Sequence, residues 1–251
     1  MIGSVELRVA DLERSRRFYT EAIGLEEVAG EPLALGAGGK PLVVLREAAP
    51  GTPAPPNSTG LFHLALLHPS RAELSKALLR LVETGVRLDG ASDHAVSEAL
   101  YLHDPDFNGI ELYRDRPREK WPEAEDGGVG MVTLPLDVQA LLNEAEPLNG
   151  ETVHGDTIMG HVHLKVSDLE RSVAFYTDEL GMSIRARYGS QAAFLAFGDY
   201  HHHLGLNTWQ SQGGGPPPPG SAGLDRFTFS GAEEGELSDP DGIAIRRQAA
   251  Q

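Results

Sequence analysis

The sequence predicts an α+β fold built from four βαβββ-like modules, the fourth of which is truncated. The main observation is an internal repeat, because Val5–Gly24 recurs 157 residues later as Val162–Gly181 with twelve of twenty positions identical. Such self-similarity indicates the duplication of a structural unit. The second observation is that a different strand–helix–strand unit follows each copy of the repeat, complete in the first half of the chain and reduced in the second.

Each copy of the repeat is expected to form a strand followed by a helix. In the first copy, apolar and polar residues alternate over Val5–Val9, which is the period of a half-buried strand. A helix then begins at Asp11, and in the second copy at a capping box made by Ser167 and Glu170. Both copies end in glycine, the residue that most often closes a helix in the left-handed conformation. Short strands follow the helices at Pro41–Leu45 and His201–Leu206.

The second type of unit begins with the apolar strand Gly60–Leu67, followed by a capping box of Ser70 and Glu73. Apolar residues then recur at helical spacing, which predicts an amphipathic helix that ends at Gly85. Two further strands and the turn that joins them are expected at His94–His103, Ile110–Tyr113 and Asp104–Gly109.

A reduced copy of this unit lies near the C-terminus, where Gly223–Ser230 and Asp239–Ile245 repeat the strand and the turn with almost no helix. The expected organisation is an N-terminal pair of modules, a crossover linker and a C-terminal pair. These cover residues 1–113 (modules 1–48 and 59–113), 114–157 with a short strand and helix in Met131–Ala145, and 158–248 (modules 158–211 and 221–248).

Composition limits the partners and the chemistry of the chain. The 251 residues carry a formal net charge of −16, which disfavours nucleic acid and anionic membranes as partners. The sequence has no cysteine, so a metal would need histidine and carboxylate ligands. Neither a signal-peptide pattern nor an apolar run of about 20 residues is present, so a cytoplasmic location without a membrane partner is expected.

Three motifs carry a resemblance to a known family. DLERSxxFY opens the helix in both copies of the repeat, DPDFNGIEL begins at Asp104, and GDYHHHLGLNTW spans Gly198–Trp209. With the four modules, these motifs resemble the vicinal oxygen chelate superfamily of glyoxalase I, bleomycin and fosfomycin resistance proteins and extradiol ring-cleaving dioxygenases. The chain most resembles the bacterial catechol-2,3-dioxygenase-like proteins. The resemblance implies that the modules pair into two open β-barrels, one of which cups a divalent metal.

The resemblance also implies which residues bind this metal. In the family, one ligand lies seven residues before the position that opens each helix, which selects His63 and His161, and another is the glutamate of the last strand, here Glu111. His163 shares a strand face with His161 and stays an alternative ligand. One metal is therefore expected in a barrel formed by the second and third modules, while the first and fourth form a metal-free support barrel. The residues aligned with ligands in that support barrel are Ser4, Arg226 and Ala244.

Two imidazoles and one carboxylate form the facial triad of non-haem Fe(II) oxygenases, and Mn(II) is the alternative metal. By the same resemblance, His202 is the acid–base residue, Tyr101 hydrogen-bonds a substrate oxygen, and His94 is a further active-site histidine. The competing interpretations are structural: a core histidine for His63, an internal salt bridge for Glu111 and core packing for Tyr101. Surface or turn positions are expected for the remaining histidines His68, His103 and His154.

The expected function is an Fe(II)-dependent extradiol dioxygenase that cleaves catechol- or hydroquinone-type aromatics with dioxygen. The first alternative is a glyoxalase-like metal-dependent lyase or isomerase, or a thiol transferase, on the same scaffold. The second alternative is a protein that sequesters a drug or an aromatic compound in a degenerate barrel. The missing helix of the fourth module would leave an apolar face uncovered, so homo-oligomerisation is a further expectation.

Overall fold

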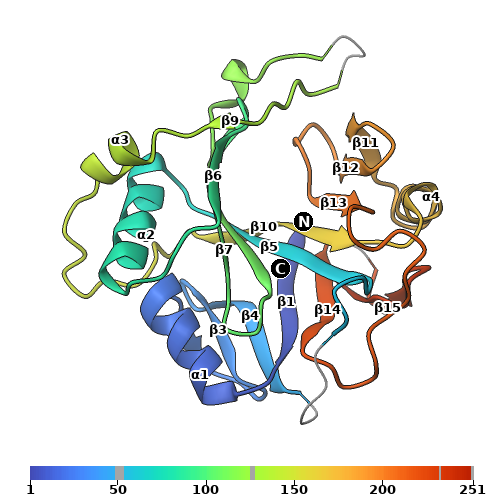
Figure 1. Ribbon diagram of the computed structural model, residues 1–251, viewed down its shortest axis with the longest axis horizontal. Helices are drawn as coiled ribbons and strands as arrows, with labels where there is room; N and C mark the ends of the chain where they lie inside the picture. The colour runs from blue at the N-terminus through green and yellow to red at the C-terminus, as the bar shows by residue number, and fades with distance from the viewer. Residues whose placement is uncertain (49–53, 125–127, 232, 250–251) are drawn as a thin grey trace.

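The computed structural model describes residues 1–48, 54–124, 128–231 and 233–249, and the four expected modules follow one another along the chain (Figure 1). The first module consists of β1 (Ile2–Val9), α1 (Leu12–Arg17) continued by a π-helical turn η1 (Phe18–Ile23), β2 (Glu26–Val28), β3 (Ala34–Ala37) and β4 (Lys40–Glu47). The second consists of β5 (Gly60–Leu67), α2 (Arg71–Glu83), β6 (Gly90–Asp93), β7 (Ser97–His103) and β8 (Gly109–Asp115).

The linker contributes η2 (Arg118–Lys120), β9 (Leu134–Pro135) and α3 (Val138–Asn143). The third module consists of β10 (Ile158–Lys165), α4 (Leu169–Leu180), β11 (Ser183–Tyr188), β12 (Ala192–Ala196) and β13 (Leu204–Asn207). Within its described residues the fourth module has strands alone, β14 (Gly223–Ser230), β15 (Gly235–Ser238) and β16 (Ala244–Gln248). The α+β class and the truncation of the fourth module are therefore confirmed.

The strands form two curved sheets, each of which joins modules from the two halves of the chain. A seven-stranded sheet with the order β15-β16-β14-β1-β4-β3-β2 combines the first and fourth modules. A nine-stranded sheet with the order β11-β12-β13-β10-β5-β8-β7-β6-β9 combines the second and third. In Figure 1, α2 and α4 lie on opposite sides of the molecule, and the central strands β5 and β10 cross beside β1 and β14. The two modules that carry the expected ligands therefore share one open barrel.

Side-chain alternation gives the nine-stranded sheet an apolar face and a polar face. On β5, Leu64 and Leu66 enter the main hydrophobic core, so His63 points to the other face. The parallel strand β8 pairs Glu111 with Ala65, which lies on the same face as His63. The antiparallel strand β10 likewise directs its two histidines away from the core. The register of three neighbouring strands thus gathers the polar residues on one concave surface.

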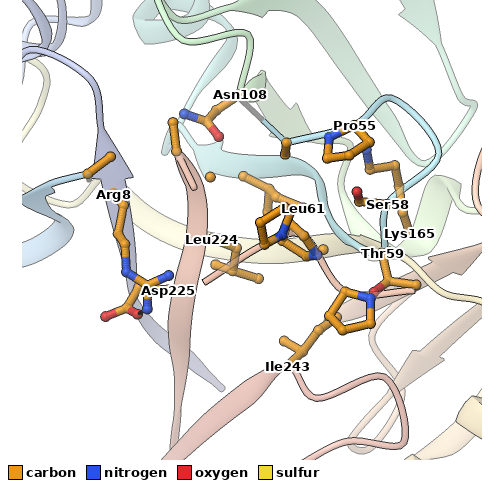
Figure 2. A pocket seen from close by; sticks show the side chains of 18 of the residues that line it. Arg8, Pro55, Ser58, Thr59, Leu61, Asn108, Lys165, Leu224, Asp225 and Ile243 are labelled. Carbon is orange, nitrogen blue, oxygen red and sulfur yellow. Dashed lines mark hydrogen bonds and ion pairs between the residues drawn. The ribbon is translucent and has the colours of Figure 1, made fainter. Parts of the chain in front are cut away.

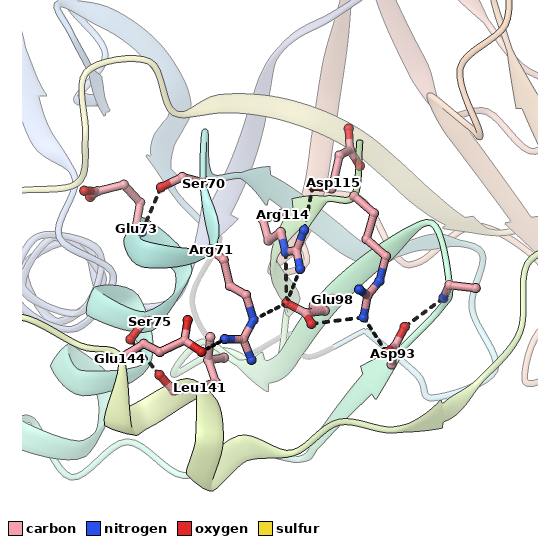
Figure 3. Close-up of polar contacts among 12 residues, drawn as sticks. Ser70, Arg71, Glu73, Ser75, Asp93, Glu98, Arg114, Asp115, Leu141 and Glu144 are labelled. Atoms are coloured by element: carbon pink, nitrogen blue, oxygen red, sulfur yellow. Dashed lines mark hydrogen bonds and ion pairs between the residues drawn. The ribbon is translucent and has the colours of Figure 1, made fainter. Parts of the chain in front are cut away.

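The opposite face of β7 and β8 holds a buried carboxylate that pins the sheet to α2 (Figure 3). Glu98 accepts hydrogen bonds from Arg71 of α2 and Arg114 of β8, both at 2.9 Å, and from Arg116 at 3.1 Å. Arg116 also pairs with Asp93. Because a buried carboxylate is costly without partners, this cluster fixes how the helix lies on the strands behind the candidate site.

The cap of α4 differs from the expected capping box. Asp168, and not Ser167, is the N-cap, and its side chain accepts the N–H of Arg171. The side chain of Ser167 instead donates to Asp241 of the fourth module. Asp11 caps α1 in the same way as Asp168, so the two copies of the repeat use equivalent caps.

Histidines at three places in the chain differ in position or burial from what the sequence predicts. His201–His203 precede β13 instead of forming its first part, because the chain bends there before the ladder with β12 begins. His94 lies in the turn between β6 and β7. His68 follows β5, where its backbone N–H donates to the carbonyl of Tyr113, but its side chain is buried and not at the surface.

One alignment in the support barrel is also wrong. Between β14 and β16, Arg226 pairs with Ala244. Between β5 and β8, the corresponding residue His63 pairs with Gly109, two positions before Glu111. The position of Glu111 is therefore held by Arg246 and not by Ala244.

The turn before β16 explains this difference. Gly242 has a φ of +82°, and the residue with the equivalent left-handed conformation in the other turn is Phe107, with a φ of +63°. Aligning Gly242 with Gly109 therefore shifts the strand that follows by two residues.

An ion-pair cluster occupies this part of the support barrel. Glu6, which corresponds in the repeat to His163, is buried and accepts hydrogen bonds from Arg46 at 3.3 Å and from Arg246 at 3.1 Å. Arg226, at the position of His63, lies 3.8 Å from the same carboxylate. Guanidinium groups cannot bind a cation, so the residues present do not fit a second metal.

No helix in the described ranges is long and apolar enough to cross a membrane.

Candidate metal centre and active-site pocket

Three donor atoms converge on the concave face of the nine-stranded sheet. Oε2 of Glu111 lies 3.0 Å from Nε2 of His63 and 3.1 Å from Nε2 of His161, and the two imidazole nitrogens are 3.3 Å apart. All three side chains are buried. Ligands bonded at about 2.1 Å to one octahedral or tetrahedral ion are about 3.0–3.4 Å apart, so these residues fit a divalent metal without rearrangement.

The protonation states of Glu111 and His161 also suit a metal. Burial by itself raises the pKa of Glu111, but the neighbouring imidazoles of His161 and His63 outweigh it and hold that pKa well below its usual range. Burial lowers the pKa of His161. An ionised carboxylate beside a neutral imidazole is the combination that a metal ion requires, because each ligand must offer a lone pair.

His161 is held mainly by packing. Its ring centroid lies 4.1 Å from that of His202 and 4.9 Å from that of Tyr113. Nδ1 of His161 is buried and makes no hydrogen bond within the described part of the chain. The orientation of this ring therefore depends on its aromatic neighbours.

His163, the alternative ligand, lies outside the group of donors that one ion can reach, which among the described residues is His63, Glu111 and His161. Its Nε2 accepts a hydrogen bond from the side-chain amide of Asn207 at 3.1 Å. The backbone of Gly205 passes so close that a Cβ there would lie 2.8 Å from the His163 ring. His163 is thus a packed wall residue, and this position on β13 requires glycine.

A cavity of about 500 Å³ opens beside the three donors. Ala65 and Ala99, on the same face as the donors, pack with Tyr113 in a small buried cluster next to the cavity. Its wall is largely aromatic and apolar. The lining residues comprise Phe62, His63, Ser92, His94, Ser97, Tyr101, Glu111, Met131, Val132, Thr133, His163, Tyr188, Phe194, His202 and Trp209.

A second, larger cavity of about 910 Å³ lies apart from the donors, where the loop near Pro55 approaches β1 and β14 (Figure 2). Arg8, Lys165 and Asp225 are among its lining residues, and none of the three donors is. Size alone would favour this cavity. The smaller cavity is the candidate active site because two of the three donors, His63 and Glu111, line it.

The three expected catalytic residues all line the smaller cavity. Tyr101 lies directly opposite Glu111 in the β7–β8 ladder, and burial together with this carboxylate raises the pKa of Tyr101 well above its usual value. Its hydroxyl lies 2.8 Å from Nε2 of His94, whose Nδ1 is 2.6 Å from the carbonyl of Val132. Tyr101 is therefore a neutral phenol whose orientation is set by His94.

His202 lines the cavity from the segment that precedes β13, and not from the expected strand His201–Leu206. The residue is instead fixed by a hydrogen bond of 2.7 Å between its Nδ1 and Nδ1 of His201. His201 in turn lies 2.9 Å from Asp115.

Asp115 is a site residue that the motifs do not predict, although the strand period contains a signal for it. Asp115 lies four residues after Glu111 on the same strand, and the period of two places both on the concave face. Asn207, which contacts His163, similarly lies within the motif GDYHHHLGLNTW that carries the family resemblance.

Known proteins share the sequence pattern and the fold of this chain. The sequence matches the family model described as Glyoxalase/Bleomycin resistance protein/Dioxygenase superfamily over residues 1–112 and 158–231. It is 44% identical over 241 residues to the Bacillus subtilis (strain 168) protein named catechol-2,3-dioxygenase, covering 94% of this chain and 84% of that protein.

Solved structures share the fold at low sequence identity. A candidate dioxygenase from Bacillus subtilis subsp. subtilis strain 168 matches with a TM-score of 0.63 at 13% identity, over 99% of this chain and 84% of that one. Glyoxalase I from Zea mays matches with a TM-score of 0.59 at 17% identity, over 98% of this chain and 91% of that one. The family match and the close relative establish that the chain belongs to the glyoxalase/bleomycin resistance protein/dioxygenase superfamily.

Proposed function

We propose that this protein is an extradiol ring-cleaving dioxygenase that uses Fe(II), with Mn(II) as the alternative, to cleave catechol- or hydroquinone-type aromatics with dioxygen in the cytoplasm. The observation that carries the proposal is the convergence of His63, His161 and Glu111 beside an aromatic-lined cavity. The relative named catechol-2,3-dioxygenase supports the reaction type. His63, His161 and Glu111 would hold the metal, which supplies the redox-active centre at which the aromatic diol and dioxygen react.

His202 is the proposed acid–base residue. Burial and the neighbouring His161 hold the pKa of His202 well below its usual range, so its imidazole is neutral. A neutral imidazole accepts the proton of a diol hydroxyl and returns it to the product when the ring opens. The neutral phenol of Tyr101 has a single hydrogen and would donate it to a substrate oxygen in place of Nε2 of His94, its neighbour at 2.8 Å.

The cavity lining favours an uncharged aromatic ring. The residues that line it among the described parts of the chain include no lysine or arginine, and the whole chain carries a charge of −16. Phe62, Phe194 and Trp209 offer flat apolar surfaces, and Tyr188 is exposed at the rim. Catechols with alkyl or aryl substituents therefore fit better than catechols that carry a carboxylate.

The third module offers no second carboxylate for a glyoxalase-type metal centre. A glyoxalase-like isomerase would be expected to show a second carboxylate on the last strand of the third module. The strand β13 has Gly205 and Asn207 on the concave face instead. The dioxygenase is therefore favoured over the lyase or isomerase.

Oxygen uptake after anaerobic reconstitution with Fe(II) tests the proposal. With catechol and alkylcatechols, uptake of one dioxygen per catechol and a yellow ring-opened product are expected. The activity should be lost in His63→Ala and kept in His103→Ala, a control at an exposed histidine. Tight metal binding without uptake would favour a lyase, isomerase or transferase. Failure to bind any divalent metal would favour a protein that sequesters aromatic compounds.

A further inference from the structure

We propose that Asp115 and His201 are positioning residues that select the tautomer of His202, so that its Nε2 carries the lone pair that faces the substrate cavity. The proposal rests on the proposed function for the role of His202. Its structural basis is a chain of two hydrogen bonds, from Oδ1 of Asp115 to Nε2 of His201 at 2.9 Å and from Nδ1 of His201 to Nδ1 of His202 at 2.7 Å.

The chain begins with a carboxylate whose two oxygens both accept. Oδ2 of Asp115 accepts the hydroxyl proton of Tyr200 at 2.9 Å, and that hydroxyl oxygen lies 2.8 Å from the hydroxyl of Tyr113. Because Tyr200 donates to Asp115, Tyr113 must donate to Tyr200. In this proposal Oδ1 is an acceptor as well, so its partner, Nε2 of His201, carries the hydrogen.

This assignment determines the next hydrogen bond. In this proposal His201 has a single hydrogen, on Nε2, so that Nδ1 of His201 is the acceptor in the bond to His202. Nδ1 of His202 must then carry the hydrogen in the bond between the two rings, and Nε2 of His202 is left with a free lone pair. No described residue is hydrogen-bonded to Nε2 of His202, while His202 lines the cavity. When this nitrogen takes the proton of a diol hydroxyl, the Nδ1–H bond to His201 stays in place.

The surroundings of His201 keep its ring in this orientation. The residue is fully buried, and its ring centroid lies 4.1 Å from that of Tyr200 and 5.1 Å from that of Trp121. The ring therefore cannot turn away from Asp115 without displacing two large aromatic side chains.

Asp115→Asn is the decisive change because it keeps the shape of the side chain. Its amide oxygen still accepts from Tyr200, so its NH₂ group faces Nε2 of His201 and donates to it. His201 then carries hydrogen on Nδ1, and His202 is forced into the opposite tautomer, with hydrogen on Nε2. In serine proteases, Asp→Asn behind the catalytic histidine selects the wrong tautomer and lowers kcat about 10⁴-fold.

The tautomers are read directly from long-range ¹H–¹⁵N correlation spectra of the ¹⁵N-histidine-labelled protein loaded with Zn(II), a diamagnetic probe. His202 is assigned by the loss of its signals in His202→Gln. Hydrogen on Nδ1 of His202 is expected in the wild type and in Asp115→Glu, and hydrogen on Nε2 in Asp115→Asn. Asp89→Asn is the matched control, because it alters a different Asp–His pair. In that pair, Oδ2 of Asp89 lies 2.5 Å from Nδ1 of His103.

With Fe(II), Asp115→Asn should lower kcat at least 100-fold with little change in KM or metal content, and Asp89→Asn should change neither. Hydrogen on Nε2 of His202 in the wild type, or an unchanged tautomer in Asp115→Asn, would overturn the proposal. The spectra do not depend on turnover. If no catechol is oxidised but the tautomers respond as described, the dioxygenase proposal fails while the positioning role of Asp115 and His201 stands.

Discussion

The hydroxyl of Tyr19 donates a hydrogen bond of 3.1 Å to Oδ2 of Asp104, and both groups are buried. The repeat reproduces this contact, because Tyr176 donates to Oδ2 of Asp239 at the same distance. In each half of the chain, a helix of the odd module is thereby joined to the turn before the last strand of the even module. The duplicated segment thus preserves a contact between modules as well as a fold within one.

Tyr19→Phe should lower the free energy of unfolding by about 1–3 kcal/mol, because it leaves Asp104 without one of its buried partners. Tyr176→Phe should cost a similar amount, and the double variant should show nearly additive losses because the two sites are separate. Urea unfolding measures all three. A neutral effect at either site would contradict the contact's structural role.

Glu98→Ala should destabilise the protein by about 3–5 kcal/mol, because Arg71, Arg114 and Arg116 would lose their shared buried carboxylate. The matched change at the exposed ion pair of Glu170 with Arg187, Glu170→Ala, should cost less than about 1 kcal/mol. Denaturant unfolding compares the two. Equal losses would show that the Glu98 cluster is no more important than a surface pair.

His68 makes stability depend on pH. Burial, with a smaller contribution from Arg80, lowers the pKa of His68 from 6.5 to about 3. The unfolded chain therefore binds a proton that the folded protein excludes, and stability present above pH 6.5 is lost as the pH falls toward 3. Between pH 7.5 and pH 5 this group alone should remove about 2 kcal/mol. His68→Gln should flatten that part of the pH profile, while His103→Gln, at an exposed site, should not.

Metal binding should raise the melting temperature of the wild type, by roughly 5–10 °C at a hundredfold excess over Kd, and a chelator should reverse the shift. Glu111→Gln and His161→Asn should lose the shift. His163→Asn should keep it, because the Nε2 atom of His163 is already engaged by Asn207. Differential scanning calorimetry with Mn(II) gives the comparison, and loss of the shift in His163→Asn alone would make His163 the ligand instead.

Substrate charge should be selected at the cavity rim. Val132→Lys adds a cation at a half-exposed lining position, and KM for carboxylated catechols should fall about tenfold while KM for alkylcatechols changes little. Val132→Gln is the neutral control of similar length. Equal changes for both classes of catechol would argue against charge selection.

Much of the fold was predictable because its signals are local. Each copy of the repeat, the helix cap at Ser70 and the strand Gly60–Leu67 is recognised from residues only a few positions apart. The structure reproduces them. The family spacing, with a ligand seven residues before each helix start, also predicts His63 and His161 as metal ligands. The structure brings both residues beside Glu111.

The remaining features depend on contacts that no local pattern encodes. Burial of His68, the residue after β5, depends on the packed tertiary structure. The register of Arg246 depends on which turn residue adopts a positive φ, and Phe107 does so without being glycine. The hydrogen bond between Asp115 and His201 joins residues 86 apart in the sequence, so only the folded structure reveals it.

The nine-stranded sheet takes His63 and Glu111 from the first half of the chain and His161 from the second. A metal ion bound there would act as a removable cross-link between the two halves, and its loss would release a constraint on their relative position. Neither half, expressed alone, would hold a complete ligand set. Two separately expressed fragments divided within 114–157 would therefore recover metal binding only when they reassemble, which ties the chemistry to the intact pairing of β5 with β10.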